Sequence, residues 1–167
     1  ENLTPITVFI GPNSAGKTNL IDALYFLREC TLEGTFQPIQ RRGGMEKIHT
    51  VGVSSEEQTE VEIKSTLGSY MIGLDGQNAI SDVAEQLHDP TGRLLMRANR
   101  GGGVEVKGEA EDQLVPFPDA PFGWEQTLLS ELQHRPVFKD IYHYITQRWQ
   151  LLDEGFMPSL SLASGIS

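Results

Sequence analysis

The sequence predicts a mixed α/β fold of the α+β kind, and three features of the 167-residue chain predict it. A short apolar run near the amino end leads through a glycine-containing turn into a stretch with helical spacing of its apolar residues. The middle of the chain alternates apolar and polar residues, as half-exposed antiparallel strands do. Near the carboxyl end the apolar residues return to helical spacing.

The first elements are a strand and a helix. The run "ITVFI" (Ile6 to Ile10) is β-branched and aromatic, which predicts a strand buried on both faces. A helix is predicted from Lys17 to about Glu29, and its apolar positions are Leu20, Ile21, Leu24 and Leu27. A loop rich in Gly, Gln and Arg is predicted to follow, through Gly44. The local excess of positive charge in "QRRGGMEK" is interpreted as a solvated loop; it consists of Arg41, Arg42 and Lys47.

An antiparallel block of four or five half-exposed strands is predicted next. The segment "TEVEIKS" (Thr59 to Ser65) alternates strictly, which predicts a strand. The segment "YMIGL" places on one face Tyr70, Ile72 and Leu74. Asp75-Gly76 is a tight-turn pair. The segment "RLLMRANRGGGVEVKG" predicts a second hairpin with the three glycines at its turn.

Helices are predicted after a proline-rich break at "LVPFPDAPFG". The first is short and contains Trp124, Leu128, Leu129 and Leu132. Pro136 suits the first position of the second helix. The apolar stripe of that helix, interpreted as a core face, comprises Val137, Ile141, Tyr144, Ile145, Trp149 and Leu152.

Composition limits the classes of function. The net charge of −10 does not favour a protein that binds nucleic-acid backbones over its whole surface. The single cysteine, Cys30, excludes an internal disulfide framework, fits a reducing compartment and is interpreted as a packing residue. No apolar run approaches the length of a membrane span, so we expect a cytoplasmic protein without a membrane partner. No metal-ligand spacing is formed by His49, His88, His134 and His143.

The chemistry lies in Gly11 to Thr18, because "GPNSAGKT" matches G-x-x-x-x-G-K-[ST] at every fixed position. Its glycines let successive backbone N–H groups point into one concavity, and a following helix adds its positive dipole end. Lys17 supplies a charge to the phosphates, and the hydroxyl of Thr18 is a ligand for Mg²⁺. The predicted nucleotide-binding residues are Gly11, Pro12, Asn13, Ser14, Ala15, Gly16, Lys17, Thr18 and Asn19. The predicted cofactors are ATP and Mg²⁺; no guanine-reading Asn-Lys-x-Asp segment is present, which favours ATP over GTP.

The wider string "GPNSAGKTNLIDAL" resembles the RecF/SMC-like branch of the ABC-type P-loop ATPases, which includes OLD-type and phage-defence AAA family ATPases. The residues that extend the match beyond the phosphate loop are Asn13, Asn19, Ala23 and Leu24. The resemblance implies that residues 1–167 form one amino-terminal lobe of an ATPase head. Its parts would be a P-loop strand and helix (1–30), an antiparallel β subdomain (45–118), a helical segment (122–153) and an irregular tail (154–167).

The same resemblance implies that ATP is held between two heads, with a Walker B Asp-Glu pair in one and a signature loop in the other. Asp153-Glu154 continues a helical stripe, so we interpret it as an acidic, glycine-stopped helix end rather than Walker B. Ser164 and Gly165 in the tail are not followed by a helix and are not assigned to a signature loop. By position alone, the candidates for a glutamine that touches Mg²⁺ or its water are Gln126 and Gln133.

The resulting expectation is an ATP-binding lobe whose ATP-driven engagement with a second head, in a homodimer or larger assembly, controls DNA-related work. That work would be repair, or phage defence with a partner nuclease. Hydrolysis would need elements that lie elsewhere, so the isolated chain is expected to be a poor ATPase. The alternative is a non-hydrolysing nucleotide-sensing or scaffold module, in which ATP stabilises a protein interface. A small-molecule phosphotransferase would need an acceptor pocket and an arginine-bearing lid, and the sequence indicates neither.

Overall fold

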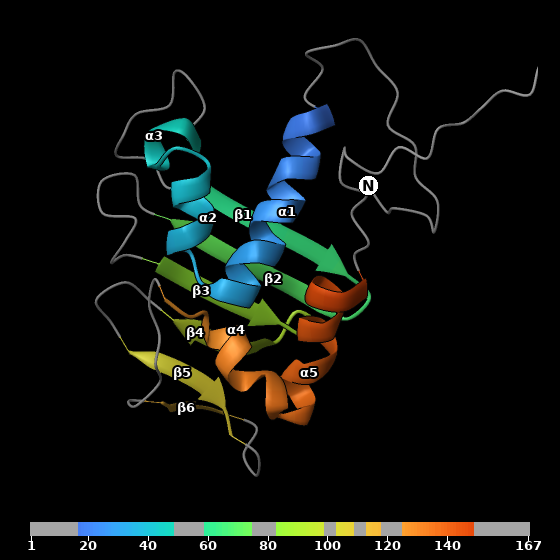
Figure 1. The fold of residues 1–167 in the computed structure, drawn as a ribbon. Coiled ribbons are helices and arrows are strands. Elements are labelled where there is room, and N and C mark those ends of the chain that lie inside the picture. The colour runs from blue at the N-terminus through green and yellow to red at the C-terminus, as the bar shows by residue number, and fades with distance from the viewer. Residues whose placement is uncertain are drawn as a thin grey trace, which may run out of the picture.

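The computed structural model describes residues 17–48, 59–74, 83–98, 103–108, 113–117 and 125–148. These residues form two layers, an antiparallel sheet and a set of helices that cover one of its faces (Figure 1). The predicted strand at Ile6 to Ile10, the Asp75-Gly76 turn and the segment from Trp149 to Ser167 lie outside the described residues.

Within the described residues the sheet has six strands, each antiparallel to the next along the chain. They are β1 (Thr59–Ser65), β2 (Gly68–Leu74), β3 (Val83–His88), β4 (Leu94–Ala98), β5 (Val104–Lys107) and β6 (Leu114–Pro116). The predicted strands at β1 and β2 and the hairpin of β4 and β5 are confirmed. The expected four or five strands are too few. The three-residue β6 occupies the start of the proline-rich break, where Pro116 ends a short edge strand.

The helices include two that the sequence did not predict. They are α1 (Lys17–Glu33), α2 (Phe36–Arg41), α3 (Met45–Ile48), α4 (Leu128–Glu131), the 3₁₀ helix η1 (Leu132–His134), α5 (Pro136–His143) and the π-helical turn η2 (Tyr144–Arg148). The helix at Lys17 and the place of Pro136 at a helix start are confirmed. The loop predicted through Gly44 is wrong over its first part, because α2 follows α1 after only two residues, whereas α3 begins after Gly44. Gly34 makes this possible, since its positive φ of 79° ends α1 within one residue.

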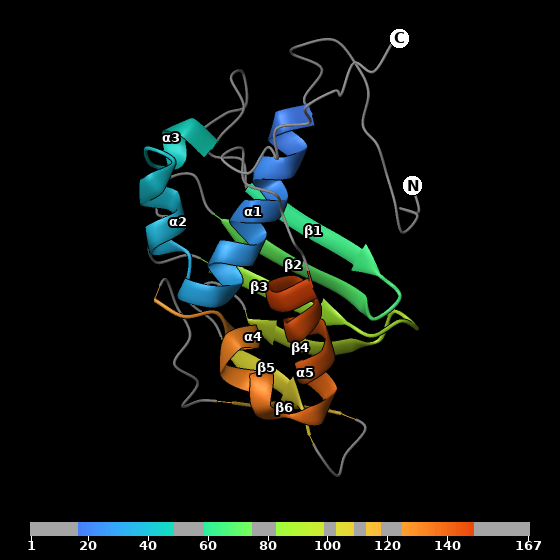
Figure 2. The same cartoon turned by 45° about the vertical axis from the view of Figure 1, so that its right-hand side comes forward.

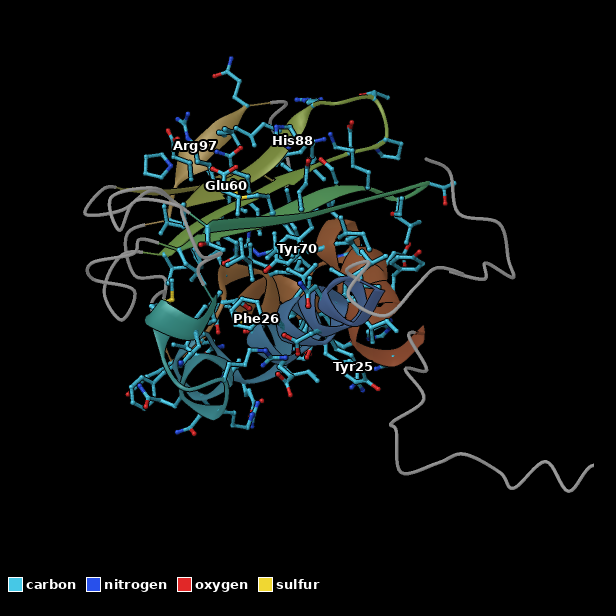
Figure 3. All side chains as sticks on the ribbon, turned by 90° about the horizontal axis from the view of Figure 1, so that it is seen from above. Tyr25, Phe26, Glu60, Tyr70, His88 and Arg97 are labelled. Atoms are coloured by element: carbon cyan, nitrogen blue, oxygen red, sulfur yellow. The ribbon has the colours of Figure 1, made fainter. Side chains whose placement is uncertain are left out.

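The core lies between the sheet and the helices. The predicted inward face of β2 is confirmed, because Tyr70, Ile72 and Leu74 are all buried. Cys30 is fully buried and burial raises the pKa of its thiol, which agrees with a packing residue. Figure 3 shows Tyr70 beneath the sheet on the side of the helices, whereas Glu60, His88 and Arg97 lie on the opposite, outer face. The main members from the helices are Phe26, Leu27, Cys30, Leu128, Leu129, Leu132, Phe138, Ile141 and Ile145.

Two of the predicted apolar stripes are buried only in part. Leu27 is buried, but Leu20 and Ile21 are 41% and 45% exposed. The reason is visible in Figures 1 and 2, where the amino-terminal turn of α1 extends past β1. In α5 the predicted Val137 is exposed and Phe138 takes its place in the core. Among the described helices, none combines the length and the apolar character that crossing a membrane requires.

Candidate nucleotide site

The phosphate-loop residues Gly11 to Gly16 lie outside the described residues, and so do the side chains of Lys17 and Thr18. The structure does describe the element that follows them. The 17-residue α1 runs from Lys17, the position at which the motif requires a helix. The first N–H groups of a helix have no partner within it, and together with the helix dipole they favour an anion at that end. The described part of the site therefore fits an anionic ligand.

Arg42, on the turn after α2, contacts one side of α1. Its guanidinium donates hydrogen bonds to Asp22, at 2.9 Å and 3.1 Å, and to Glu29 at 2.6 Å. The carbonyl oxygen of Pro38 accepts another at 3.2 Å, and the ring centroid of Phe26 lies 5.0 Å from the guanidinium carbon. The Arg42 side chain is only 17% exposed. The interpretation of Arg42 as part of a solvated loop is therefore wrong.

The other two positively charged residues of "QRRGGMEK" are exposed to solvent, as predicted, although they lie in helices rather than in a loop. Lys47 is exposed. Arg41 is 47% exposed and pairs with Glu33 and Glu29 near the carboxyl-terminal end of α1. Adjacent arginines thus differ because the turn after α2 directs one of them onto α1 and leaves the other at the surface.

A buried carboxylate joins the sheet to the start of α4. Glu85 of β3 is fully buried and accepts a hydrogen bond from the hydroxyl of Tyr70 at 2.7 Å. The backbone N–H groups of Leu128 and Leu129 donate to it at 2.6 Å and 2.8 Å. Both groups belong to the first turn of α4, where backbone donors have no helical partner. Burial raises the pKa of Glu85 from 4.5 to about 7, in opposition to the three donors, which lower it.

This raised pKa predicts a pH-dependent stability. Between pH 4.5 and about 7 the folded chain holds a proton on Glu85 that the unfolded chain has released. The stabilisation is therefore complete below pH 4.5 and is lost as the pH rises through about 7. Urea unfolding of the wild type and of Glu85→Gln, measured across this range, should show the wild type losing stability relative to the variant as the pH rises. A constant difference between the two proteins would contradict the prediction.

The two candidate glutamines have local partners. The amide of Gln126 donates to Glu131 at 3.0 Å, and that of Gln133 donates to the carbonyl oxygen of Ser130 at 2.7 Å. The hydroxyl of Thr127, next to Gln126, lies 3.5 Å from the carbonyl oxygen of Thr31. At 1.5 Å per residue, Thr31 lies about 21 Å along α1 from Lys17. The described structure therefore places Gln126 near the opposite end of α1 from Lys17.

Sequence reasoning missed both Glu85 and the contacts of Arg42. A usable signal existed for Glu85, because "VAEQLH" alternates and Val83, Glu85 and Leu87 share the inward face of β3. A charged residue at such a position needs buried partners. No comparable signal existed for Arg42, whose neighbour has the same side chain. In the part of the chain that the structure describes, no three His, Cys, Asp or Glu residues gather as a metal site.

Comparison with known families identifies the class of protein. A family model described as an AAA domain, a putative AbiEii toxin of a type IV toxin–antitoxin system, matches residues 6–97. The match covers more than half of the chain, from the predicted phosphate-loop strand into β4. The chain belongs to this AAA domain family. Neither a curated protein nor a solved structure gave a significant match.

As an AAA domain, the chain is an ATP-binding NTPase of the P-loop type. The mixed α/β structure with its antiparallel sheet is compatible with this class. ATP and Mg²⁺ are the ligands that the family indicates, and the start of α1 at Lys17 fits an anionic ligand there.

Proposed function

We propose that this AAA domain is the ATP-binding lobe of a RecF/SMC-like ATPase. The observation that carries the proposal is the order of elements within the matched region. The motif "GPNSAGKTNLIDAL" leads into α1, and an antiparallel meander follows α1 and α2. A nucleoside kinase would more often continue into alternating strands and helices around a parallel sheet. The proposal divides the chain into the strand–helix unit, the β subdomain and the helical segment.

In this proposal the backbone from Gly11 to Gly16 surrounds the phosphates. Lys17 places its ammonium group against the β- and γ-phosphates, and Thr18 offers its hydroxyl to the metal ion. When bound, Mg²⁺ neutralises phosphate charge, which is the chemistry that nucleotide hydrolysis requires. The contribution of α1 is to hold Lys17 and Thr18 at its amino end.

We propose further that ATP brings two such heads together and that this engagement controls a partner, either DNA or a nuclease. In this proposal a DNA contact is confined to a restricted face, because the net charge of −10 disfavours binding of phosphate backbones over the whole surface.

Replacement of Lys17 tests the nucleotide site. We expect Lys17→Ala to weaken Mg·ATP binding at least about tenfold, because a charge-assisted contact to phosphate is lost. Titration calorimetry on the full chain measures the affinity. Lys47→Ala is the matched control, since Lys47 is exposed and lies in α3.

Equal affinities of the wild type and Lys17→Ala would refute the site. The affinity of Lys47→Ala should equal that of the wild type. Rapid, sustained ATP turnover by the isolated chain would contradict the expectation that hydrolysis needs elements that lie elsewhere. Binding without turnover even in the presence of a partner would instead favour the non-hydrolysing alternative.

A further inference from the structure

The helix α1 is held mainly by its carboxyl-terminal half. Phe26, Leu27 and Cys30 are buried, whereas all four described side chains from Asn19 to Asp22 are exposed. The amino-terminal turn also extends past the edge of the sheet (Figure 2). A rigid helix anchored in this way acts as a lever, so a small tilt at the anchored half displaces the end that carries Lys17.

Arg42 contacts the helix across this boundary. Asp22, Phe26 and Glu29 follow one another at intervals of four and three residues, so they lie on one face of α1. Hydrogen bonds from the Arg42 guanidinium reach both carboxylates, and the guanidinium stacks near the ring between them. Asp22 lies five residues after Lys17, about 7.5 Å along the helix axis.

The second attachment of Arg42 is to α2. The Pro38 carbonyl oxygen accepts a hydrogen bond at 3.2 Å, and Arg42 itself directly follows Arg41, the last residue of α2. Burial works against the charged form of Arg42, but the hydrogen bonds that it donates to Asp22 and Glu29 outweigh this cost, so the pKa of Arg42 is raised. One permanently charged side chain thus connects α2 to two turns of α1. A lysine could not do the same, because it lacks the planar fork of donors.

We infer that Arg42 is a positioning residue for the nucleotide site, which it serves by fixing the direction of the amino-terminal half of α1. This inference rests on the proposed nucleotide binding. Lys17 lies twelve residues before Glu29, about 18 Å along the axis, so a tilt of about 10° around Glu29 would move Lys17 by about 3 Å. Binding sites tolerate displacements of only about 0.5 Å.

The test compares the Mg·ATP affinity of the full chain in four variants by titration calorimetry. Arg42→Met keeps the apolar stem and removes the hydrogen bonds, and we expect its affinity to fall about tenfold, as misplacement of a site by an ångström or more can cause. Asp22→Asn removes the charge partner nearer to Lys17 and should lower the affinity by a smaller factor. Arg42→Lys should have an affinity close to that of Arg42→Met, because lysine lacks the planar fork of donors. Arg41→Ala, the control at the adjacent surface arginine, should change the affinity less than about twofold.

Hydrogen–deuterium exchange without nucleotide gives a second readout. Arg42→Met should speed exchange of the backbone amides from Leu20 to Phe26, and Arg41→Ala should not. Val106→Ala, in the buried part of β5, controls for general destabilisation. If Val106→Ala weakens binding as much as Arg42→Met does, the positioning role is overturned.

Unchanged exchange in Arg42→Met also overturns that role, whatever the nucleotide data show. If the wild type binds Mg·ATP and Arg42→Met binds it equally well, only the inference about Arg42 fails. If the wild type does not bind at all, the proposed function fails, and the exchange data alone decide whether Arg42 holds α1.

Discussion

Glu85→Ala is expected to lower the free energy of unfolding by about 4 kcal/mol, enough to remove much of the stability of an ordinary domain. The substitution leaves the backbone N–H groups of Leu128 and Leu129 without the acceptor that they have in the wild type. It also removes the acceptor of the Tyr70 hydroxyl, which is fully buried. Each buried donor that loses its partner costs about 1–3 kcal/mol, and the cavity adds to this cost.

Urea unfolding followed by far-ultraviolet circular dichroism measures this loss. Glu85→Gln is the matched variant: its amide oxygen keeps acceptor capacity, but its NH₂ group faces a donor, so we expect an intermediate loss of about 2 kcal/mol. Tyr70→Phe removes one donor and leaves the carboxylate bonded to both backbone groups, so it should cost about 1 kcal/mol. A stability of Glu85→Ala equal to that of Tyr70→Phe would show that the capping of α4 contributes nothing.

Gly68→Ala should be the second strongly destabilising change, with an expected loss of at least about 3 kcal/mol. Gly68 opens β2 with a φ of 128°, a conformation that residues with a Cβ atom rarely adopt. A Cβ atom at this position would also overlap the backbone carbonyl oxygen of His88. The backbone of His88 cannot move away freely, because it is paired with Ser69 and lies at the irregularity between β3 and β4.

The control for Gly68→Ala is Gly92→Ala. Gly92 also has a positive φ, of 86°, but a Cβ atom there would meet nothing within 4 Å. Gly92→Ala should therefore lower the free energy of unfolding only by the cost of the backbone conformation, about 1 kcal/mol. Thermal unfolding of the two variants separates the cost of the backbone conformation, which both share, from the cost of the steric overlap with His88, which only Gly68→Ala has. Equal losses would mean that the sheet moves to accommodate the methyl group at Gly68.

Much of the fold could be read from local patterns. Strict alternation predicted β1, and the shared face of Tyr70, Ile72 and Leu74 predicted β2, because a strand with one covered face needs a period of two. Pro136 marked a helix start, since proline has no N–H group to leave unpaired there. The three-residue β6 and the short α2 were missed because elements of that length contain too few residues to show a period.

In the candidate site, too, the local features can be predicted from the sequence, whereas distances between elements cannot. The phosphate-binding motif is recognisable because a phosphate cradle needs fixed residue types at fixed spacing within eight consecutive residues. Gln126 is a candidate by its order in the chain alone, but order does not determine distance. The contact between Thr127 and Thr31 places Gln126 near the carboxyl-terminal end of α1.

By itself, then, the amino-acid sequence determined the nucleotide-binding motif, the helix that follows it and the strands β1, β2, β4 and β5, because each depends on neighbours within a few residues. Only the tertiary structure decided the roles of Arg42 and Glu85. The two carboxylate partners of Arg42 lie 13 and 20 residues away in the chain, and the backbone donors to Glu85 lie 43 and 44 residues away. No period or motif around a charged residue indicates partners so far away in the chain. The residue and its partners come together only when the sheet and the helices pack.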